Sequence, residues 1–136
     1  MSWRALFVCI GNSCRSPMAE GFANYYGKGW ISAYSAGSHP AGFLMPLTLQ
    51  VMEEKGIDIS HQTSKGLTEV SLKDMDSIVI LDSSLSHLAS NLPQRANKIF
   101  WILPDPVGKP VEVYRAVRDE IELRVLDFIE AIRKVT

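Results

Sequence analysis

Short apolar segments alternate with amphipathic segments along this chain, and that alternation is the strongest constraint on its fold. The clearest apolar segment covers residues 76–82, and a similar one covers residues 5–10. Nearly continuous apolar runs of this length are typical of strands buried on both faces of a parallel sheet. Two further strands are expected at residues 30–35 and 98–103.

Segments with helical periodicity separate these strands. Helices are expected from Ser16-Pro17 to about Tyr26, and over residues 46–55, 84–91 and 111–135. Serine at the cap and proline at the first helical position mark the start of the first helix. The β-α-β-α-β-α-β-α order predicts an α/β fold, with a four-stranded parallel sheet and helices on both faces. The 136 residues are enough for one domain, residues 1–136, with one core.

Composition and charge exclude several classes of protein. The formal net charge is -1, with acidic and basic residues mixed along the chain. We therefore expect neither a nucleic-acid partner nor a polybasic membrane patch. No apolar run approaches the roughly 18 residues of a membrane span, and the first residues contain too few apolar positions for a signal peptide. The expected location is the cytoplasm.

A loop rich in polar and reactive residues follows the first expected strand. It reads Cys9-Ile10-Gly11-Asn12-Ser13-Cys14-Arg15-Ser16, a Cys-x5-Arg loop that leads into a helix. Its backbone N–H groups can turn inward around a tetrahedral anion, and the helix N-terminus adds a favourable field. The same field favours a thiolate at the first cysteine. The loop therefore predicts a phosphate-like oxyanion site built by Ile10, Gly11, Asn12, Ser13, Cys14 and Arg15.

Individual side chains of this loop suit the same chemistry. Arg15 supplies a planar fork that matches two oxygens of the anion, and Ser16 is placed to donate a hydrogen bond to the Cys9 sulfur. Gly11 allows a tight turn, and Asn12 tolerates a left-handed conformation. A nucleotide-binding P-loop is excluded because no Gly-Lys-Ser/Thr follows. The alternative interpretation is a plain strand–helix turn with an incidental cysteine and arginine.

Only two cysteines and three histidines are present. Both cysteines lie in one loop, so a secreted disulfide framework is not expected. The histidines are scattered and form no zinc pattern, so we expect no metal and no cofactor in the chemical step. A candidate proton donor is Asp105, which lies between two prolines just after the fourth expected strand, although aspartate in such a turn is also a common turn former.

The segment from Val8 to Glu20 closely resembles the signature of the low-molecular-weight protein tyrosine phosphatases. It reads Val-Cys-Ile-Gly-Asn-Ser-Cys-Arg-Ser-Pro-Met-Ala-Glu. The same fold includes the bacterial arsenate reductases that are coupled to thioredoxin. Further shared features are an Asp-Pro pair near the C-terminus, here Asp105-Pro106, and a Ser-Ala pair after the second strand, here Ser35-Ala36. The resemblance extends over nearly the whole chain.

This resemblance implies roles for individual residues. Cys9 is similar to the family's nucleophile and Arg15 to its phosphate clamp. Asp105 matches the general acid, which protonates the leaving group and then activates water against the thiophosphate intermediate. Cys14 matches a second cysteine that traps an oxidised nucleophile as a disulfide, although it can equally be a small wall residue. Asn12, Ser16, Ser35 and His61 fall where the phosphatases hold their loop by hydrogen bonds.

Two enzymatic readings follow from the resemblance. The first is a hydrolase of phosphate monoesters, with protein phosphotyrosine as the expected substrate and a cysteinyl-phosphate intermediate. The second is an arsenate reductase that uses the same nucleophile. Reductases coupled to thioredoxin need two more cysteines just after the third strand, where this chain has Leu81-Asp82-Ser83-Ser84-Leu85. The reductase reading therefore requires arsenate and a small external thiol as partners, whereas the phosphatase reading requires a phosphorylated protein or small phosphoester. A third interpretation is a silent oxyanion-binding regulatory module.

Two positions bear on the substrate and on a cation. The residues after Asp105-Pro106 are Val107-Gly108-Lys109, without the tyrosines that stack on phosphotyrosine in the family, so Trp101, His39 and Phe43 are the candidates for ring contacts. Lys65 falls about where the potassium-binding reductases place an acidic ligand. We therefore expect either a surface lysine or an ammonium group that fills the cation site beside Asn12, Glu20 and Ser35.

Overall fold

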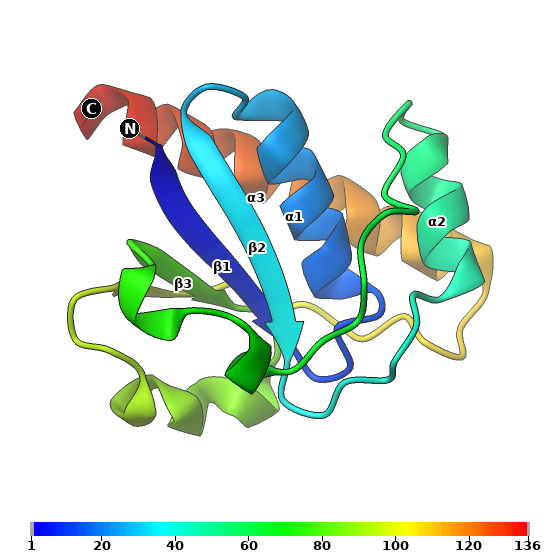
Figure 1. Cartoon of the computed structure of the whole chain (residues 1–136). Coiled ribbons are helices and arrows are strands. Elements are labelled where there is room, and N and C mark those ends of the chain that lie inside the picture. Colours follow the sequence, from blue (N-terminus) through cyan, green and yellow to red (C-terminus); the bar gives the residue numbers. More distant parts are fainter. Residues whose placement is uncertain (1, 136) are drawn as a thin grey trace.

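Four parallel strands form one sheet at the centre of the computed structural model, which describes residues 2–135 (Figure 1). In chain order they are β1 (Trp3–Cys9), β2 (Ile31–Gly37), β3 (Ser77–Ile80) and β4 (Asn97–Phe100). Their order across the sheet is β2-β1-β3-β4, with β1 paired to both β2 and β3. The predicted α/β class and the four-stranded parallel sheet are confirmed.

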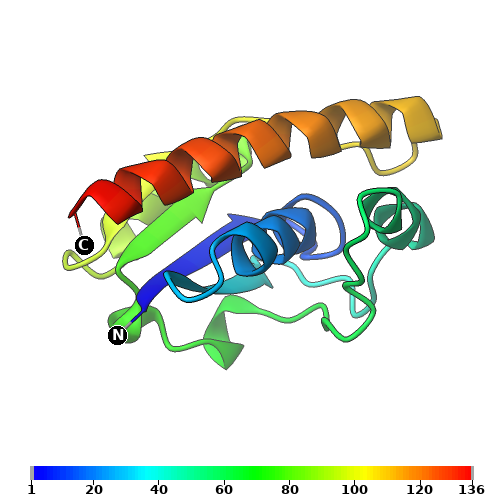
Figure 2. The same ribbon diagram turned by 90° about the horizontal axis from the view of Figure 1, so that it is seen from above.

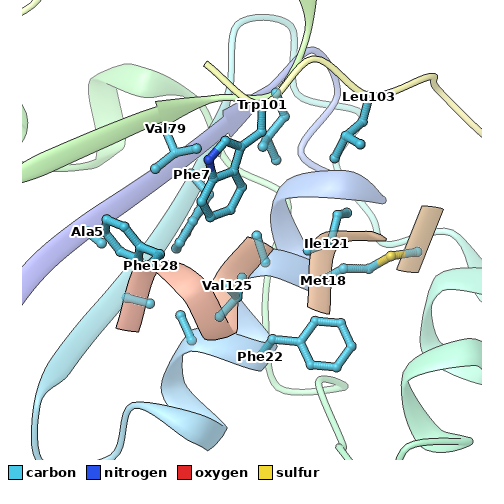
Figure 3. Close-up of a cluster of buried hydrophobic side chains, with 14 of the residues drawn as sticks. Ala5, Phe7, Met18, Phe22, Val79, Trp101, Leu103, Ile121, Val125 and Phe128 are labelled. Atoms are coloured by element: carbon cyan, nitrogen blue, oxygen red, sulfur yellow. The ribbon is translucent and has the colours of Figure 1, made fainter. Parts of the chain in front are cut away.

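Two α-helices, α1 (Arg15–Tyr26) and α3 (Val111–Val135), cover one face of this sheet (Figure 2). The third, α2 (Pro46–Glu53), lies to the side of the strands and packs against α3 and α1. Side chains that alternate along the central strands point to this face and pack against α1 and α3 (Figure 3). Phe7 contacts Trp101 and Phe128 with ring centroids 5.7 and 6.2 Å apart. Among the described residues, no helix is long and apolar enough to span a membrane.

Short 3₁₀ helices cover the other face. They are η1 (Leu67–Glu69), η2 (Leu72–Asp74) and η3 (Ser83–Asn91), and they pack on Leu6, Val8, Ile78 and Ile80. The sequence predicted an ordinary short helix over residues 84–91 and missed η1 and η2. In η3, Ser86 and Ser90 donate their hydroxyls to the carbonyls three residues earlier. These side-chain hydrogen bonds favour the tighter helix.

The start of α1 also differs from the prediction. The helix begins at Arg15, with Cys14 at the cap and no side-chain cap bond, so Ser16 and Pro17 are its second and third residues. Proline is tolerated there because the first N–H groups of a helix have no partner within it. The Ser16 hydroxyl is thus free for contacts outside the helix.

The strand order places a ligand site at the carboxyl end of the sheet. The chain moves from β1 to β2 on one side and then returns to β3 on the other side. In sheets of this kind, ligands bind outside the carboxyl ends of the strands, where the winding reverses. The segments that follow β1, β3 and β4 meet at this end: residues 9–15, 81–82 and 101–105.

Candidate active site

The loop from Cys9 to Arg15 has its carbonyl groups turned outward. Four of them accept hydrogen bonds from the segment after β2: the N–H groups of Ser38, His39, Ala41 and Met45 donate to the carbonyls of residues 9, 10, 11 and 13, over 2.8–3.2 Å. A trans peptide directs its N–H opposite to its C=O. The N–H groups of residues 10, 11, 12 and 14 therefore turn away from that segment, as an anion-binding loop requires.

The loop's sharp turn depends on Asn12 and Gly37. Asn12 has a φ of 47°, in the left-handed region predicted for it. Its side chain points away from the anion site. Its Oδ1 accepts a hydrogen bond from the Lys65 N–H, and its Nδ2 donates one to Ser16 Oγ, each at 2.9 Å. Gly37 lies so close that a Cβ there would be 2.5 Å from the Ile10 carbonyl oxygen. Only glycine fits at this contact.

Cys9 ends β1 with its sulfur beside the Ser16 hydroxyl. The sulfur and Ser16 Oγ are 2.9 Å apart. Because Ser16 Oγ already accepts a hydrogen bond from Asn12, its own proton is free for the sulfur. A hydroxyl that donates to sulfur stabilises a thiolate over a thiol. The predicted contact between Ser16 and the nucleophile is present.

Arg15 is nearly completely buried and held from one side. Its Nη1 donates to the carbonyls of Leu81 and Leu103, at 3.3 and 2.9 Å, and lies 2.8 Å from a carboxylate oxygen of Asp82. Its Nη2 lies 3.7 Å from a carboxylate oxygen of Asp105. Arginine is strongly fixed when several acceptors hold it.

Asp105 lies at the rim of the site. One of its oxygens accepts from the Val107 N–H at 3.0 Å, and the side chain is 48% exposed. Val107, Phe43 and Met45 line the same cavity of about 380 Å³, together with Cys9, Ile10, Gly11, Ser13, Cys14, Arg15 and Ala41. A carboxyl group in this place can exchange a proton with a group that leaves from the cavity.

Cys14 lines the cavity as a protonated thiol. Burial raises its pKa from 9.0 to about 12, against the opposing effect of a hydrogen bond with Thr48. The nearby Cys9 and Asp105 raise the pKa further. Thr48 also donates its hydroxyl to the Ser13 carbonyl at 3.0 Å, which fastens the loop to α2.

Of the residues predicted to support the loop, Asn12 and Ser16 hydrogen bond within it, whereas Ser35 and His61 do not. Ser35 donates instead to a carboxylate oxygen of Glu20 at 2.5 Å. Burial raises the pKa of Glu20, while Ser35, Lys65 and His61 act to lower it. His61 is exposed. The hydrogen bonds from its segment to the loop come from two later residues: Ser64 donates its hydroxyl to the Gly11 carbonyl, and the Lys65 N–H donates to Asn12 Oδ1. For Lys65, the ammonium donates to the Thr63 carbonyl at 2.9 Å rather than filling a site between Asn12, Glu20 and Ser35.

Of the three residues predicted to contact a substrate ring, Phe43 lies at the cavity, whereas Trp101 and His39 do not line it. Phe43 is exposed and lines the cavity. Trp101 is buried in the core against Phe7 and Phe128, and the His39 ring forms a hydrogen bond with the Ser38 hydroxyl.

Four residues that contact the loop or Arg15 are not predicted from the sequence: Asp82, Thr48, Ser64 and Gly37. For Asp82, the one available signal was its place at the end of a buried strand.

Comparison with known proteins adds to this geometry. The model of the family described as "Low molecular weight phosphotyrosine protein phosphatase" matches residues 4–136. An arsenate reductase of Brevibacillus brevis is 40% identical over 125 residues, which cover 91% of this chain and 92% of the relative. A solved low molecular weight protein tyrosine phosphatase from T. tengcongensis is 36% identical, with a TM-score of 0.85, over 96% of this chain and 99% of that one. An arsenate reductase in its phosphate binding state is also 36% identical, with a TM-score of 0.81, over 96% and 98%.

Proposed function

Because this chain belongs to the low molecular weight phosphotyrosine protein phosphatase family, we propose that it is an arsenate reductase in which Cys9 is the nucleophile and an external thiol is the reductant. The observation that carries the proposal is the likeness to an arsenate reductase over nine tenths of both chains. The loop supports it, because a ring of N–H groups with one guanidinium suits a tetrahedral oxyanion.

The first step forms a bond between sulfur and arsenic. Arsenate binds in the loop against Nη2 and Nε of Arg15, displacing the carboxylate of Asp105 from its place 3.7 Å from Nη2. The Cys9 thiolate, which Ser16 stabilises over 2.9 Å, attacks arsenic, and one arsenate oxygen leaves as water. Asp105 at the rim supplies a proton to that oxygen. The product is a covalent adduct of Cys9 with arsenic(V).

The second step transfers two electrons to arsenic. An external thiolate attacks the sulfur of Cys9, and the electrons of the S–As bond leave with arsenic as arsenite. A second thiol then attacks the mixed disulfide, releasing an oxidised disulfide and the free Cys9 thiolate. Overall, arsenate and two thiols give arsenite, one disulfide and water. A reductant must come from outside, because the only other cysteine of the chain is Cys14, and a disulfide between Cys9 and Cys14 would leave both cysteines oxidised.

Hydrolysis of phosphate monoesters is the second candidate function. One observation favours it: Asp105 lies at the rim of the cavity, where it can protonate a leaving alcohol and then activate water. Phe43 at the mouth supplies an aromatic surface for a phenyl ester, including phosphotyrosine. In this reading the covalent intermediate is a cysteinyl phosphate. The segment after β3 contains no cysteine for an internal redox relay, and hydrolysis needs none.

A paired assay on one preparation separates the two functions. Arsenite formation from arsenate is measured with glutathione, mycothiol, or thioredoxin and its reductase, beside hydrolysis of para-nitrophenyl phosphate. Arsenite formation that depends on a small thiol and is lost in Cys9→Ser supports the proposal. Ester hydrolysis with no arsenite formation assigns the enzyme as a phosphatase. Phosphate binding without either reaction would identify a silent oxyanion-binding module.

A further inference from the structure

Arg15 contacts two carboxylates, and the chemistry described above uses only one of them. Asp105 lines the cavity and is half exposed, 3.7 Å from Nη2. Asp82 lies 2.8 Å from Nη1, with its side chain 15% exposed, on the side of the guanidinium that also holds the carbonyls of Leu81 and Leu103. Asp82 therefore stays on Arg15 when an oxyanion displaces Asp105.

The Asp82 carboxylate is fixed and ionised. Its Oδ1 accepts hydrogen bonds from the N–H and the hydroxyl of Ser84, at 2.9 and 2.6 Å, which caps η3. Its Oδ2 is left for Arg15. Burial acts to raise the pKa of Asp82, but the hydrogen bonds from Ser84 and Arg15 outweigh it and hold the pKa below its usual value. The group therefore carries a full negative charge at neutral pH.

We propose that Asp82 is an affinity-limiting residue of the site: it offsets the charge of Arg15 and so limits how tightly the site holds a doubly charged oxyanion. The two backbone carbonyls already fix Nη1 without adding charge. The distinct contribution of Asp82 is its negative charge, placed on Arg15, the only cationic side chain among the described residues that line the cavity. That charge repels a dianion and favours its release. The inference deepens the proposed function, since it concerns the same oxyanion in the same loop.

The direction of the effect distinguishes this inference from a structural role. If Asp82 merely supported the site, its loss would disorder Arg15 and weaken anion binding. If its charge limits binding, its loss strengthens anion binding by about 3- to 10-fold, the Coulomb effect of one charge on a dianion roughly 7–12 Å away when solvent screens the pair about as strongly as bulk water. Salt reduces this gain, because the carboxylate is partly exposed.

The test uses Asp82→Ser, because serine is neutral and still caps a helix. Inorganic phosphate binding is measured by calorimetry at pH 8, where phosphate is a dianion, in low and high salt. We expect tighter phosphate binding, with a lower KM for arsenate and an unchanged or lower kcat. Unchanged or weaker phosphate binding in the folded variant overturns the inference. Should Asp82→Ser fail to fold, as judged by thermal melting, Asp82→Asn decides by the same criterion.

A matched control exists at the other end of the same strand. Asp76 precedes β3 and accepts from the Arg4 N–H with one oxygen and from Arg95 with the other, at 2.8 and 2.6 Å. Asp76→Asn removes the same charge far from the loop, so phosphate affinity should not change. Phosphate binding does not depend on which reaction the enzyme performs. Tighter binding in Asp82→Ser with no arsenite formation by the wild type would sink the proposed function and leave this inference standing.

Discussion

Ser16 Oγ lies 2.9 Å from the sulfur of Cys9 and accepts a hydrogen bond, also of 2.9 Å, from Nδ2 of Asn12. The hydroxyl accepts from Asn12 and keeps its own proton, which is available to the sulfur. When Cys9 is a thiolate, the sulfur has no proton to donate, so Ser16 is the donor in this contact. The residue thus belongs to the chemistry of the nucleophile, although it sits inside α1.

Ser16→Ala should slow the reaction without weakening substrate binding to the same degree. A hydrogen bond to a charged group contributes about 1.5–3 kcal/mol, so we expect kcat to fall about 10- to 100-fold. The rate at which iodoacetamide alkylates Cys9 at neutral pH should fall. Ser90→Ala, which removes an exposed hydroxyl that bonds its own helix, is the control. An unchanged alkylation rate in Ser16→Ala would show that the hydroxyl does not stabilise the thiolate.

Asp105→Asn should remove the proton donor and leave the loop intact. Loss of a general acid commonly costs about 10²- to 10⁴-fold in rate, and we expect that loss in hydrolysis of phenyl phosphate. The loss should be smaller for para-nitrophenyl phosphate, because its more acidic leaving group needs less help from a proton. Phosphate affinity should stay the same or rise, because a carboxylate 3.7 Å from Arg15 Nη2 is removed. A full rate with both esters contradicts the assignment.

Gly37→Ala should displace the anion loop. Its Cβ would lie 2.5 Å from the Ile10 carbonyl oxygen and 2.8 Å from the Asn12 nitrogen, so backbone must move. We expect destabilisation of about 1–3 kcal/mol, as for other overpacked sites, together with weaker phosphate binding. Urea unfolding and calorimetry measure the two effects. Gly66→Ala is the matched control, since Gly66 pairs with Gly37 and its Cβ would find ordinary contacts of 3.5 Å or more.

Cys14 makes both stability and disulfide formation depend on pH. Burial raises its pKa to about 12 from an ordinary value of 9.0. In the unfolded chain the Cys14 thiol loses its proton near pH 9, whereas in the folded protein it keeps it up to about pH 12. The free energy of unfolding therefore falls as pH rises from about 9 to about 12. Below about pH 9, Cys14 should therefore not contribute to pH dependence, and above it stability should fall. Comparison of urea midpoints of the wild type and Cys14→Ser from pH 7 to 11 checks this.

The same thiol determines how fast an oxidised Cys9 is trapped. The thiolate is the attacking species, so disulfide formation between Cys9 and Cys14 after peroxide treatment should quicken about tenfold per pH unit over pH 7–9. Mass spectrometry of quenched samples follows the product. Rapid, pH-independent formation would mean that Cys14 is not held as a thiol during the reaction. The protective role of Cys14 stays a prediction until then.

Local residue patterns determined the fold class and the centre of the site. The apolar runs predicted the parallel strands, and the Cys-x5-Arg spacing predicted an anion loop after β1, because strand burial and loop geometry depend on neighbours in the sequence. The helix boundaries are predicted less accurately. The helix α1 begins at Arg15, and Ser16 is not its cap, because the Ser16 hydroxyl forms hydrogen bonds with Cys9 and Asn12 instead. The 3₁₀ geometry of η3 depends on serine hydroxyls that no apolar periodicity reveals.

The sequence by itself determined which residues share the loop of the candidate site: a cysteine, an arginine and a serine at fixed spacing. Only the tertiary structure decided what surrounds them. Asp82 lies 67 positions after Arg15 in the chain, and Thr48 and Gly37 approach the loop from other elements. Such contacts depend on the order of the strands in the sheet and on how the helices pack against it. Electrostatic and steric effects act through space, so a residue distant in sequence can set the charge and shape of the site.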